Sequence, residues 1–592
     1  MRRSSTNKVH ASQWSVAVLT VSTLVLTLAL GGMGAVAADG DRLAFDASKF
    51  TVKTESVGGR TVKYRVYEGI VYVADPVDTA HQSMNLYVPA EYFEGKSVGA
   101  YNAETAPILF QNRVGGYMPA FPGTLGSGRG GPGGPFGPGG GPGGPPPAGG
   151  PGGPPPGGIF DEFDKNKDGK LSRDEAPEFI RDQFAQIDTD KDGFISREED
   201  QAFLRQRGPG GPGGPGMGRG GPGGPGGSGG GGLLAAALAR GMVVAAPGAR
   251  GSTSRSESGN NIGKAPACIV DLKAALRYLR HNDKAMPGNA ERIISNGTSA
   301  GGALSALLGG TGNSPDYDPY LKAIGAAEER DDIFAASCYC PITDLDHADM
   351  AYEWMFNGLN QYNSRGGRGT MSADQVKLSG QLKTLFPAHL NSLGLRKADG
   401  TALTLDARGE GPFKDYVKSF VIASAQKALD TGKDLSGLTW ITIKDGKVTD
   451  IAFDEYIAYA TRMKSTPAFD SLALQTPENL LFGDARTDRK HFTQFGKENG
   501  SGGSMADPAV VKMMNPMYFI GATGTTTAPF WRVRHGAADR DTSLAVPVML
   551  AAKLRNVGRT VDFASPWGQG HGGDYDPNEF FAWVDLICRQ RP

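Results

Sequence analysis

The chain has 592 residues, with 61 basic and 62 acidic side chains and a formal net charge of −1. This length exceeds what a single hydrophobic core normally supports, so we expect two or three domains. The balanced charge argues against a nucleic-acid-binding protein, which would carry clustered positive charge.

The first 37 residues have the layout of a secretory signal peptide. A basic start precedes an apolar run at residues 15–30, and Ala-Val-Ala at residues 35–37 offers an A-x-A cleavage site. The alternative is an uncleaved membrane anchor, because the apolar run could nearly cross a bilayer. We favour cleavage near Ala37. The mature protein is then expected to be secreted or periplasmic, without a membrane partner.

Residues 38–121 contain the strand-like runs YRVYEGIVYV, MNLYVP and APILFQN. Residues 122–158 and 207–232 consist almost entirely of Gly and Pro. Segments of that composition bury no apolar surface, so we expect flexible or extended linkers there. They enclose a charged piece, residues 159–206.

This charged piece contains two loops of twelve residues, DKNKDGKLSRDE and DTDKDGFISREE. Each has oxygen donors at positions 1, 3, 5 and 9, Gly at position 6 and Glu at position 12, which is the EF-hand ligand pattern. We therefore predict an inserted all-α EF-hand pair that binds Ca²⁺ at both loops. Leu171 and Ile195, at position 8, suit a short strand pair between the loops.

The second loop is expected to bind Ca²⁺ more tightly, because it supplies four carboxylates and the first loop supplies three. The predicted ligands of the first loop are Asp164, Asn166, Asp168, Lys170 (through its carbonyl), Ser172 and Glu175. Those of the second loop are Asp188, Asp190, Asp192, Phe194 (through its carbonyl), Ser196 and Glu199. Outside the cell, a structural role for Ca²⁺ is more plausible than signalling.

Residues 233–345 continue with a helix in LLAAALARG, a strand in MVVAAPG, a helix in CIVDLKAALRYLRHN and a strand in RIISNG. Together with the strands before the insert, this alternation predicts an α/β protein with a mostly parallel sheet covered on both faces. Residues 346–515 lack the alternation. They contain helical stretches and a hairpin with an Asp-Gly turn, in LTWITIKDGKVTDIAF, and we expect a lid domain that carries specificity.

Ser299 is the predicted nucleophile. It lies in Gly297-Thr298-Ser299-Ala300-Gly301, a G-x-S-x-G motif between a predicted strand and a predicted helix. The motif alone is weak in so glycine-rich a chain, and residues 226–230 match it inside a linker. Only Ser299 has the strand-turn-helix context that exposes a nucleophilic hydroxyl.

A serine nucleophile needs a base and an acid, which follow it in the order Asp, then His, in an α/β-hydrolase. Residues 516–592 supply both. The strand-like FWRVRHG leads to Asp539 and Asp541, and a glycine-rich loop after the last predicted strand carries His571. His535 is the other candidate base, but it precedes both aspartates, and we interpret it as structural. These observations predict an α/β-hydrolase.

The oxyanion hole requires two backbone N–H groups. One is expected from Ala300, directly after the nucleophile. The other is expected from the glycine-rich loop at residues 114–117, where we favour Gly116 and leave Gly115 open.

The four cysteines allow two interpretations. Cys338 and Cys340 point to the same face of a predicted strand, so they are not expected to bond to each other. Each could form a disulfide with Cys268 or Cys588, or all four could be buried thiols.

Several long stretches resemble the bacterial tannases of subtype B: NGTSAGG, CPITDLDHAD, MKSTPAFDSLALQTPENLLFG, WRVRHGAADRDTS and GQGHGGDYD. The resemblance covers most of residues 50–120 and 233–592. It implies a serine esterase for galloyl esters, with a triad of Ser299, Asp539 and His571 and no cofactor for the ester chemistry. It also implies that Lys464, Glu478 and Asp541 bind the galloyl hydroxyls. The EF-hand insert departs from the family pattern.

Two other functions fit the sequence. A feruloyl or other aromatic carboxylesterase would use the same triad with a different lid. A calcium-dependent binding or adhesion protein could be built on an inactive hydrolase scaffold, although the complete Ser-Asp-His order argues against it. The sequence leaves the oligomeric state and the natural polyphenol open.

Overall fold

The computed structural model describes residues 41–125, 168, 170–175, 184–196, 199, 230–364 and 367–590. The expected signal peptide and most of both Gly/Pro linkers lie outside these residues. The described residues divide into two compact units, one with residues 41–125, 230–364 and 367–590, and the other with residues 168, 170–175, 184–196 and 199. In the described part of the chain, no helix combines the length and apolarity needed to cross a bilayer.

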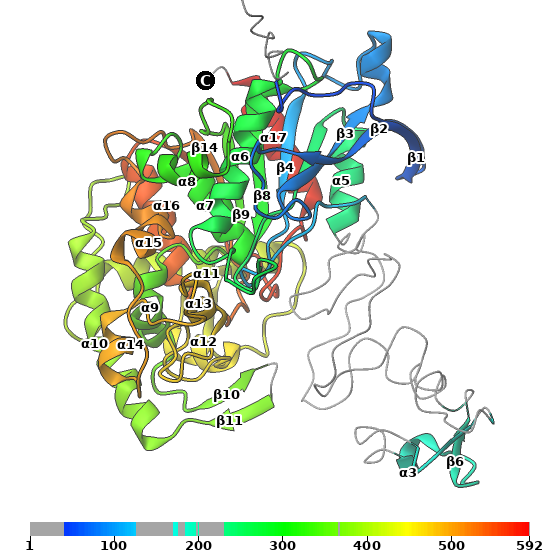
Figure 1. Cartoon of the computed structure of the whole chain (residues 1–592). Coiled ribbons are helices and arrows are strands. Elements are labelled where there is room, and N and C mark those ends of the chain that lie inside the picture. The colour runs from blue at the N-terminus through cyan, green and yellow to red at the C-terminus, as the bar shows by residue number, and fades with distance from the viewer. Residues whose placement is uncertain are drawn as a thin grey trace, which may run out of the picture. The chain divides into compact units, whose positions relative to one another are not determined.

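The larger unit is built around a mostly parallel sheet, which confirms the predicted fold class (Figure 1). Within the described residues the sheet has nine strands in the order β1-β2-β3-β7-β4-β8-β9-β14-β15. Their bounds are β1 Thr51–Val57, β2 Arg60–Val71, β3 Ser83–Pro89, β4 Pro107–Asn112, β7 Val243–Pro247, β8 Asn289–Thr298, β9 Ala335–Tyr339, β14 Phe530–Arg534 and β15 Thr560–Ala564. The first three strands run antiparallel at one edge, and β7 to β15 run parallel.

Helices pack against the sheet and bury its central strands. Every residue of β4, β7, β9 and β14 is buried, as expected for parallel strands that are covered on both faces. The helices of this core are α5 Gly230–Ala239, α6 Ala267–His281, α7 Ala300–Gly310, α8 Asp318–Ala323, α16 Ala545–Asn556 and α17 Pro577–Arg589.

The segment expected to form a lid belongs to the same compact unit and lies below the sheet in the view of Figure 1. Its elements are α9 Ala348–Phe356, β10 Gln361–Ser364, β11 Gly367–Thr370, α10 Ala373–Ser392, α11 Pro412–Asp430, β12 Ile441–Lys444, β13 Lys447–Ile451, α12 Phe453–Ala460, α13 Pro477–Leu481, α14 Gln494–Asn499 and α15 Pro508–Met513. The predicted hairpin is confirmed as β12 and β13, with the left-handed pair Asp445 (φ 51°) and Gly446 (φ 71°) at its turn.

Aromatic packing holds the lid helices together. The ring of Trp354 on α9 lies 5.3–5.8 Å from those of Phe386, Phe413 and Phe453, which come from three other helices. These rings belong to the same hydrophobic core as the residues of the sheet.

The smaller unit contains a short strand pair, β5 Lys170–Ser172 and β6 Phe194–Ser196, in which Leu171 pairs with Ile195. This is the coupling predicted between two EF-hand loops. The helix α3, Phe184–Ile187, lies between the two loops in the sequence.

All four cysteines are buried free thiols, so the disulfide alternative is not realised. The four thiols belong to α6, α17, β9 and the turn after β9.

Candidate active site

The predicted site residues gather at one edge of the sheet because β8, β9, β14 and β15 are parallel neighbours. The carboxyl ends of parallel strands meet at the same edge, and ligands bind in the crevice outside them. Ser299 follows β8, Asp539 and Asp541 follow β14, and His571 follows β15.

Ser299 occupies a sharp turn between β8 and α7, with φ 60° and ψ −125°. This positive φ is unusual for a residue with a side chain, and such strain is characteristic of functional sites. Glycines make the turn possible. A Cβ atom on Gly297 would lie 2.3 Å from the carbonyl oxygen of Gly301, and one on Gly302 would lie 2.4 Å from that of Tyr339.

The structure brings the three predicted triad side chains into one hydrogen-bonded chain. His571 Nε2 lies 2.9 Å from Ser299 Oγ, and His571 Nδ1 lies 3.0 Å from Asp539 Oδ2. Asp539 is 1% exposed and also accepts the backbone N–H of Asp541 at 2.9 Å. The contacts have the order that a serine nucleophile, a general base and an orienting acid require.

The buried carboxylate and imidazole shift each other's pKa. Burial alone would raise the pKa of Asp539, but the positive charge of His571 holds it well below its usual range. Burial alone would lower the pKa of His571, but Asp539 raises it well above its usual range. The imidazole is therefore a stronger base toward Ser299 than a free histidine.

The three predicted galloyl contacts lie next to this chain. Lys464 Nζ is 3.0 Å from Asp541 Oδ1, and the same oxygen is 4.0 Å from His571 Nε2. Glu478, in the first turn of α13, is 9% exposed. The pKa of Glu478 is raised to about 7, mainly by burial; Lys464 opposes this rise and Asp541 adds to it. Asp541 and Lys464 thus lie beside the base, and Glu478 lies close enough to both for their charges to affect its pKa.

The predicted oxyanion loop is attached to the start of α7. Asn112 Nδ2 donates to the carbonyl of Gly301 at 3.1 Å, and its Oδ1 accepts the N–H of Val114 at 3.2 Å. A Cβ atom on Gly301 would lie 2.9 Å from the carbonyl oxygen of Val114, so the loop and the helix are closely packed. Gly116 lies in this loop with φ 55°, and Ala300 is the first residue of α7.

In the EF-hand unit, Asp164 and Asn166 lie outside the described residues. The oxygens of Asp188, Asp190 and Glu199 lie within 4.8 Å of one another. Asp188 Oδ1 is buried and has no hydrogen-bond partner among the described residues, as expected of an oxygen directed at a cation. These ligands of the second loop therefore fit Ca²⁺.

The other predicted ligands that the structure describes form hydrogen bonds or ion pairs within and between the two loops. Ser172 Oγ donates to Glu175 at 2.7 Å, and Ser196 Oγ donates to Glu199 at 2.8 Å. Lys170 Nζ is paired with Asp192 at 2.6 Å across the two loops. Asp168 and Phe194 are joined to this network through backbone N–H groups. Asp168 accepts from Lys170 at 2.8 Å, and the N–H of Phe194 donates to Asp192 at 2.9 Å.

Family models match two parts of the chain: one described as BD-FAE at residues 233–367, and one described as EF hand at residues 158–175 and 180–204. Esterase LipQ of Mycobacterium tuberculosis is 31% identical over 110 residues, which cover 18% of this chain and 25% of LipQ. The residues matched by the BD-FAE model include Ser299.

Solved structures match far more of the chain. A Fusobacterium nucleatum tannase is 43% identical, covers 93% of this chain and 100% of its own, and has a TM-score of 0.73. A tannin acyl hydrolase from Lactobacillus plantarum is 38% identical over 92% of this chain and 99% of its own, also with a TM-score of 0.73. The chain belongs to the tannase family. It is a carboxylic ester hydrolase with an EF-hand insert.

Reasoning from the sequence missed a tyrosine that holds this tannase's site together. The hydroxyl of Tyr352, on α9 of the lid, donates to the carbonyl of Arg540 at 2.9 Å and accepts the N–H of Lys464 at 3.1 Å. It therefore ties the lid loop of Lys464 to the loop that carries both aspartates. Nothing in its local sequence marks it, since Arg540 lies 188 residues away.

Two further groups of this tannase surround Asp539 and were not assigned a function. His535, interpreted as structural, is 1% exposed, and burial lowers its pKa. Cys340, in a left-handed conformation (φ 48°) after β9, donates its S–H to the carbonyl of Gly572 at 3.2 Å. The pattern CYC gave no signal for this position beyond burial.

Proposed function

We propose that this tannase is a secreted serine esterase that hydrolyses galloyl ester bonds through an acyl-enzyme. The observation that carries the proposal is the chain Ser299–His571–Asp539, with the Asp541–Lys464 ion pair 4.0 Å from the reactive nitrogen of His571. A hydroxyl, a base and a set of charged groups suited to polyphenols thus converge in one place.

In the first step, Ser299 Oγ attacks the ester carbonyl carbon while His571 Nε2 takes its proton. Asp539 holds the ring in the tautomer that presents Nε2 to Ser299 and stabilises the imidazolium. The carbonyl oxygen becomes an oxyanion, which the N–H groups of Ala300 and Gly116 would stabilise. His571 then gives the proton to the leaving alcohol, and the galloyl group remains on Ser299.

In the second step, water attacks the galloyl-enzyme. His571 removes a proton from that water, and Ser299 leaves with the proton returned by the ring. Gallate is released and the starting state is restored. These steps use only side chains and backbone groups of the chain, together with water.

Recognition of the acyl group depends on Lys464, Glu478 and Asp541. A galloyl ring carries three adjacent phenols, which can donate to carboxylates and accept from an ammonium group. Substrates without these hydroxyls would leave the charged groups unpaired, which is costly at a buried site.

The comparisons support this choice of acyl group over a feruloyl group. Solved structures of tannin acyl hydrolases that are 37–38% identical to this chain are complexes with ethyl gallate and with 3,4-dihydroxybenzoate. Each covers 92% of this chain. Ferulate has one free phenol, and one free phenol cannot engage all three groups.

The test compares kcat/KM for methyl gallate, methyl ferulate and methyl benzoate on the purified chain lacking residues 1–37. Methyl gallate should be preferred over methyl benzoate by up to about 10⁴-fold, because the benzoate ring leaves the polar groups unpaired. Equal rates for all three esters, or a preference for the ferulate, would refute galloyl specificity.

We further propose that the EF-hand unit binds Ca²⁺, with Asp188, Asp190 and Glu199 among the ligands of the tighter loop. Bound Ca²⁺ would neutralise the clustered carboxylates and couple the two loops through β5 and β6. We also propose that the protein is exported, because residues 1–37 have the layout of a signal peptide.

A further inference from the structure

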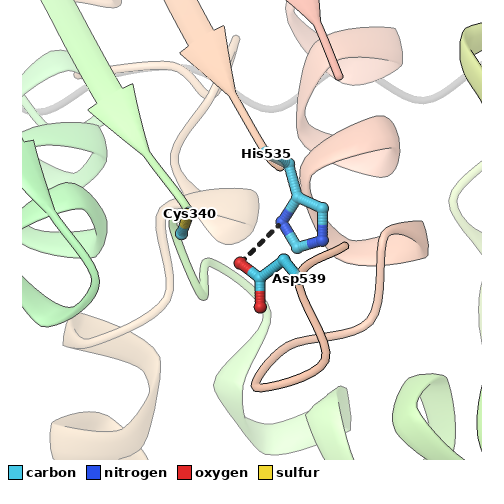
Figure 2. Close-up of side chains that lie close together, drawn as sticks. All are labelled: Cys340, His535 and Asp539. Atoms are coloured by element: carbon cyan, nitrogen blue, oxygen red, sulfur yellow. Dashed lines mark ion pairs between the residues drawn. The ribbon is translucent and has the colours of Figure 1, made fainter. Parts of the chain in front are cut away.

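A second group of metal-ligating side chains lies directly behind the triad. Figure 2 shows Cys340 at the end of β9 and His535 at the end of β14, with the carboxylate of Asp539 between them. Their ligand atoms lie within 4.8 Å of one another, and His535 Nδ1 is 3.6 Å from Asp539 Oδ2. All three residues are at most 1% exposed.

The surroundings of His535 indicate that a ligand binds here. Neither of its ring nitrogens has a hydrogen-bond partner in the described part of the chain, although the ring is buried. A buried polar group without a partner is destabilising, so such groups usually indicate a water, an ion or a functional role. Its Nδ1 is directed at Asp539, as Figure 2 shows.

The donor set identifies the class of ion. A thiolate, an imidazole and a carboxylate are typical ligands of Zn²⁺, whereas Ca²⁺ and Mg²⁺ take oxygen ligands. Tetrahedral Zn²⁺ holds such atoms at about 2.0–2.3 Å, which places them roughly 3.3–3.7 Å apart. The 3.6 Å between His535 Nδ1 and Asp539 Oδ2 already matches this spacing, and Cys340 would need only a small shift.

We propose that Cys340, His535 and Asp539 form an inhibitory site for one Zn²⁺-class cation. Binding forms the bonds from the metal to sulfur, nitrogen and oxygen, and the thiol proton is released to solvent. Water would complete the coordination. This inference rests on the proposed triad for its effect on activity, but the site itself does not depend on the triad.

Inhibition is expected because the cation would bind a carboxylate oxygen that the triad also uses. Asp539 Oδ2 is also the acceptor for His571 Nδ1, at 3.0 Å. A cation on this oxygen withdraws the negative charge that makes His571 basic and places a positive charge next to the ring. Ser299 then loses its base.

The onset of inhibition should be slow. All three ligands are buried, and the thiol of Cys340 donates to Gly572, the residue after His571. A cation must reach these buried ligands and replace the thiol proton that makes this hydrogen bond. Inhibition should therefore develop with time after mixing rather than at once.

Cobalt provides a readout that requires no catalysis. The full-length mature chain, saturated with Ca²⁺, is titrated with Co²⁺, and the charge-transfer band of a cobalt-bound thiolate is followed in the near ultraviolet. Loaded EF-hand loops and the separate cluster of Asp344, His347 and His389 offer no thiol, so the band reports a cysteine, and the Cys340→Ser variant below assigns it. One equivalent of Co²⁺ should saturate it, and Zn²⁺ should abolish it.

Methyl gallate hydrolysis measured on the same samples should fall by about 10³-fold or more as the band grows, because the triad loses its carboxylate. A zinc-selective chelator should restore it. Cys340→Ser and His535→Asn should lose the band, with thermal melting as a check that both variants fold. Cys338→Ser, two residues away on β9, is the matched control and should keep it.

The results separate the site from the function. No thiolate band at saturating Co²⁺, or a band that persists in Cys340→Ser, refutes the site. Zinc inhibition that is unchanged in Cys340→Ser also refutes it. If the metal-free protein does not hydrolyse methyl gallate, the proposed function fails while the cobalt titration still tests the site.

Discussion

Asp539 and Asp541 are separated by one residue, yet their carboxylates contact different groups. Asp539 is almost fully buried and contacts His571, whereas Asp541 contacts Lys464 and remains partly exposed at the site. The pair therefore has two roles in the proposed mechanism: Asp539 orients the base, and Asp541 contacts the substrate's phenols.

Substitution of each aspartate should separate these roles. Asp539→Asn should lower kcat/KM for methyl gallate and for a plain acetate ester equally, by about 10⁴-fold, because both reactions need the base. Asp541→Asn should lower it for methyl gallate by about 10–100-fold, the value of a charged hydrogen bond, and much less for the acetate. Parallel losses on both esters for Asp541→Asn would contradict the assignment.

Glu478 predicts a pH dependence of substrate binding. Its pKa is raised to about 7 by burial, so the carboxyl is protonated below that pH and ionised above it. An ionised acceptor binds a phenol more strongly than a neutral acid does. KM for methyl gallate should therefore fall as pH rises through 7, and this step should be missing in Glu478→Gln. An identical step in the variant would assign it to another group.

At the scale of elements, one cluster joins the lid helix α10 to the sheet. Asp344, after β9, is buried and accepts from His389 Nε2 on α10 at 2.6 Å and from His347 Nδ1 at 3.1 Å. The two rings are stacked, with centroids 3.6 Å apart. Asp346 also lies 3.4 Å from His347.

This cluster should make the stability of the lid depend on pH. Burial alone would lower the pKa of His347, but its hydrogen bonds to Asp344 and Asp346 raise it to about 10. Its stabilising contribution is therefore complete below the unfolded pKa of about 6.5 and is lost as pH rises through 10. Between pH 7 and 10, Tm should fall more for the wild type than for His347→Gln. Equal declines would show that the cluster is not responsible.

Elements with strong local signals could be predicted from the sequence. The β8–α7 turn was marked by its glycines, and the β12–β13 hairpin by its Asp-Gly turn. Strand β1 was missed because most of its residues are exposed, so it lacks the apolar pattern of a buried strand. Its pairing with β2 depends on the Gly58-Gly59 turn, where both residues have positive φ.

The site could be predicted where chain order and motifs constrain the chemistry. Ser299 and His571 were identified from a motif and from the order of the chain, and the structure brings them within 2.9 Å. The roles of Tyr352 and Cys340 could not be predicted, because their contacts with Arg540 and Gly572 join segments that only the folded sheet brings together. His535 was noted as a candidate base, and its position beside Cys340 depends on the fold. Their catalytic or regulatory roles remain predictions.

At the scale of the whole molecule, we predict that the EF-hand unit has two Ca²⁺ sites that differ in affinity. Isothermal titration of the full mature chain should resolve a tighter and a weaker event, because the second loop has one more carboxylate. Glu199→Gln should remove the tighter event, and the matched variant Glu175→Gln the weaker one. Loss of the tighter event in Glu175→Gln instead would reverse the assignment.

The proposed mechanism requires that Ser299 is acylated with the help of His571. The most direct measurement is mass spectrometry of the protein quenched with acid soon after mixing with methyl gallate. We predict a galloyl adduct on the peptide that contains Ser299, absent in Ser299→Ala and strongly reduced in His571→Ala. Rapid gallate release with no adduct on that peptide, or undiminished turnover by Ser299→Ala, would contradict the account.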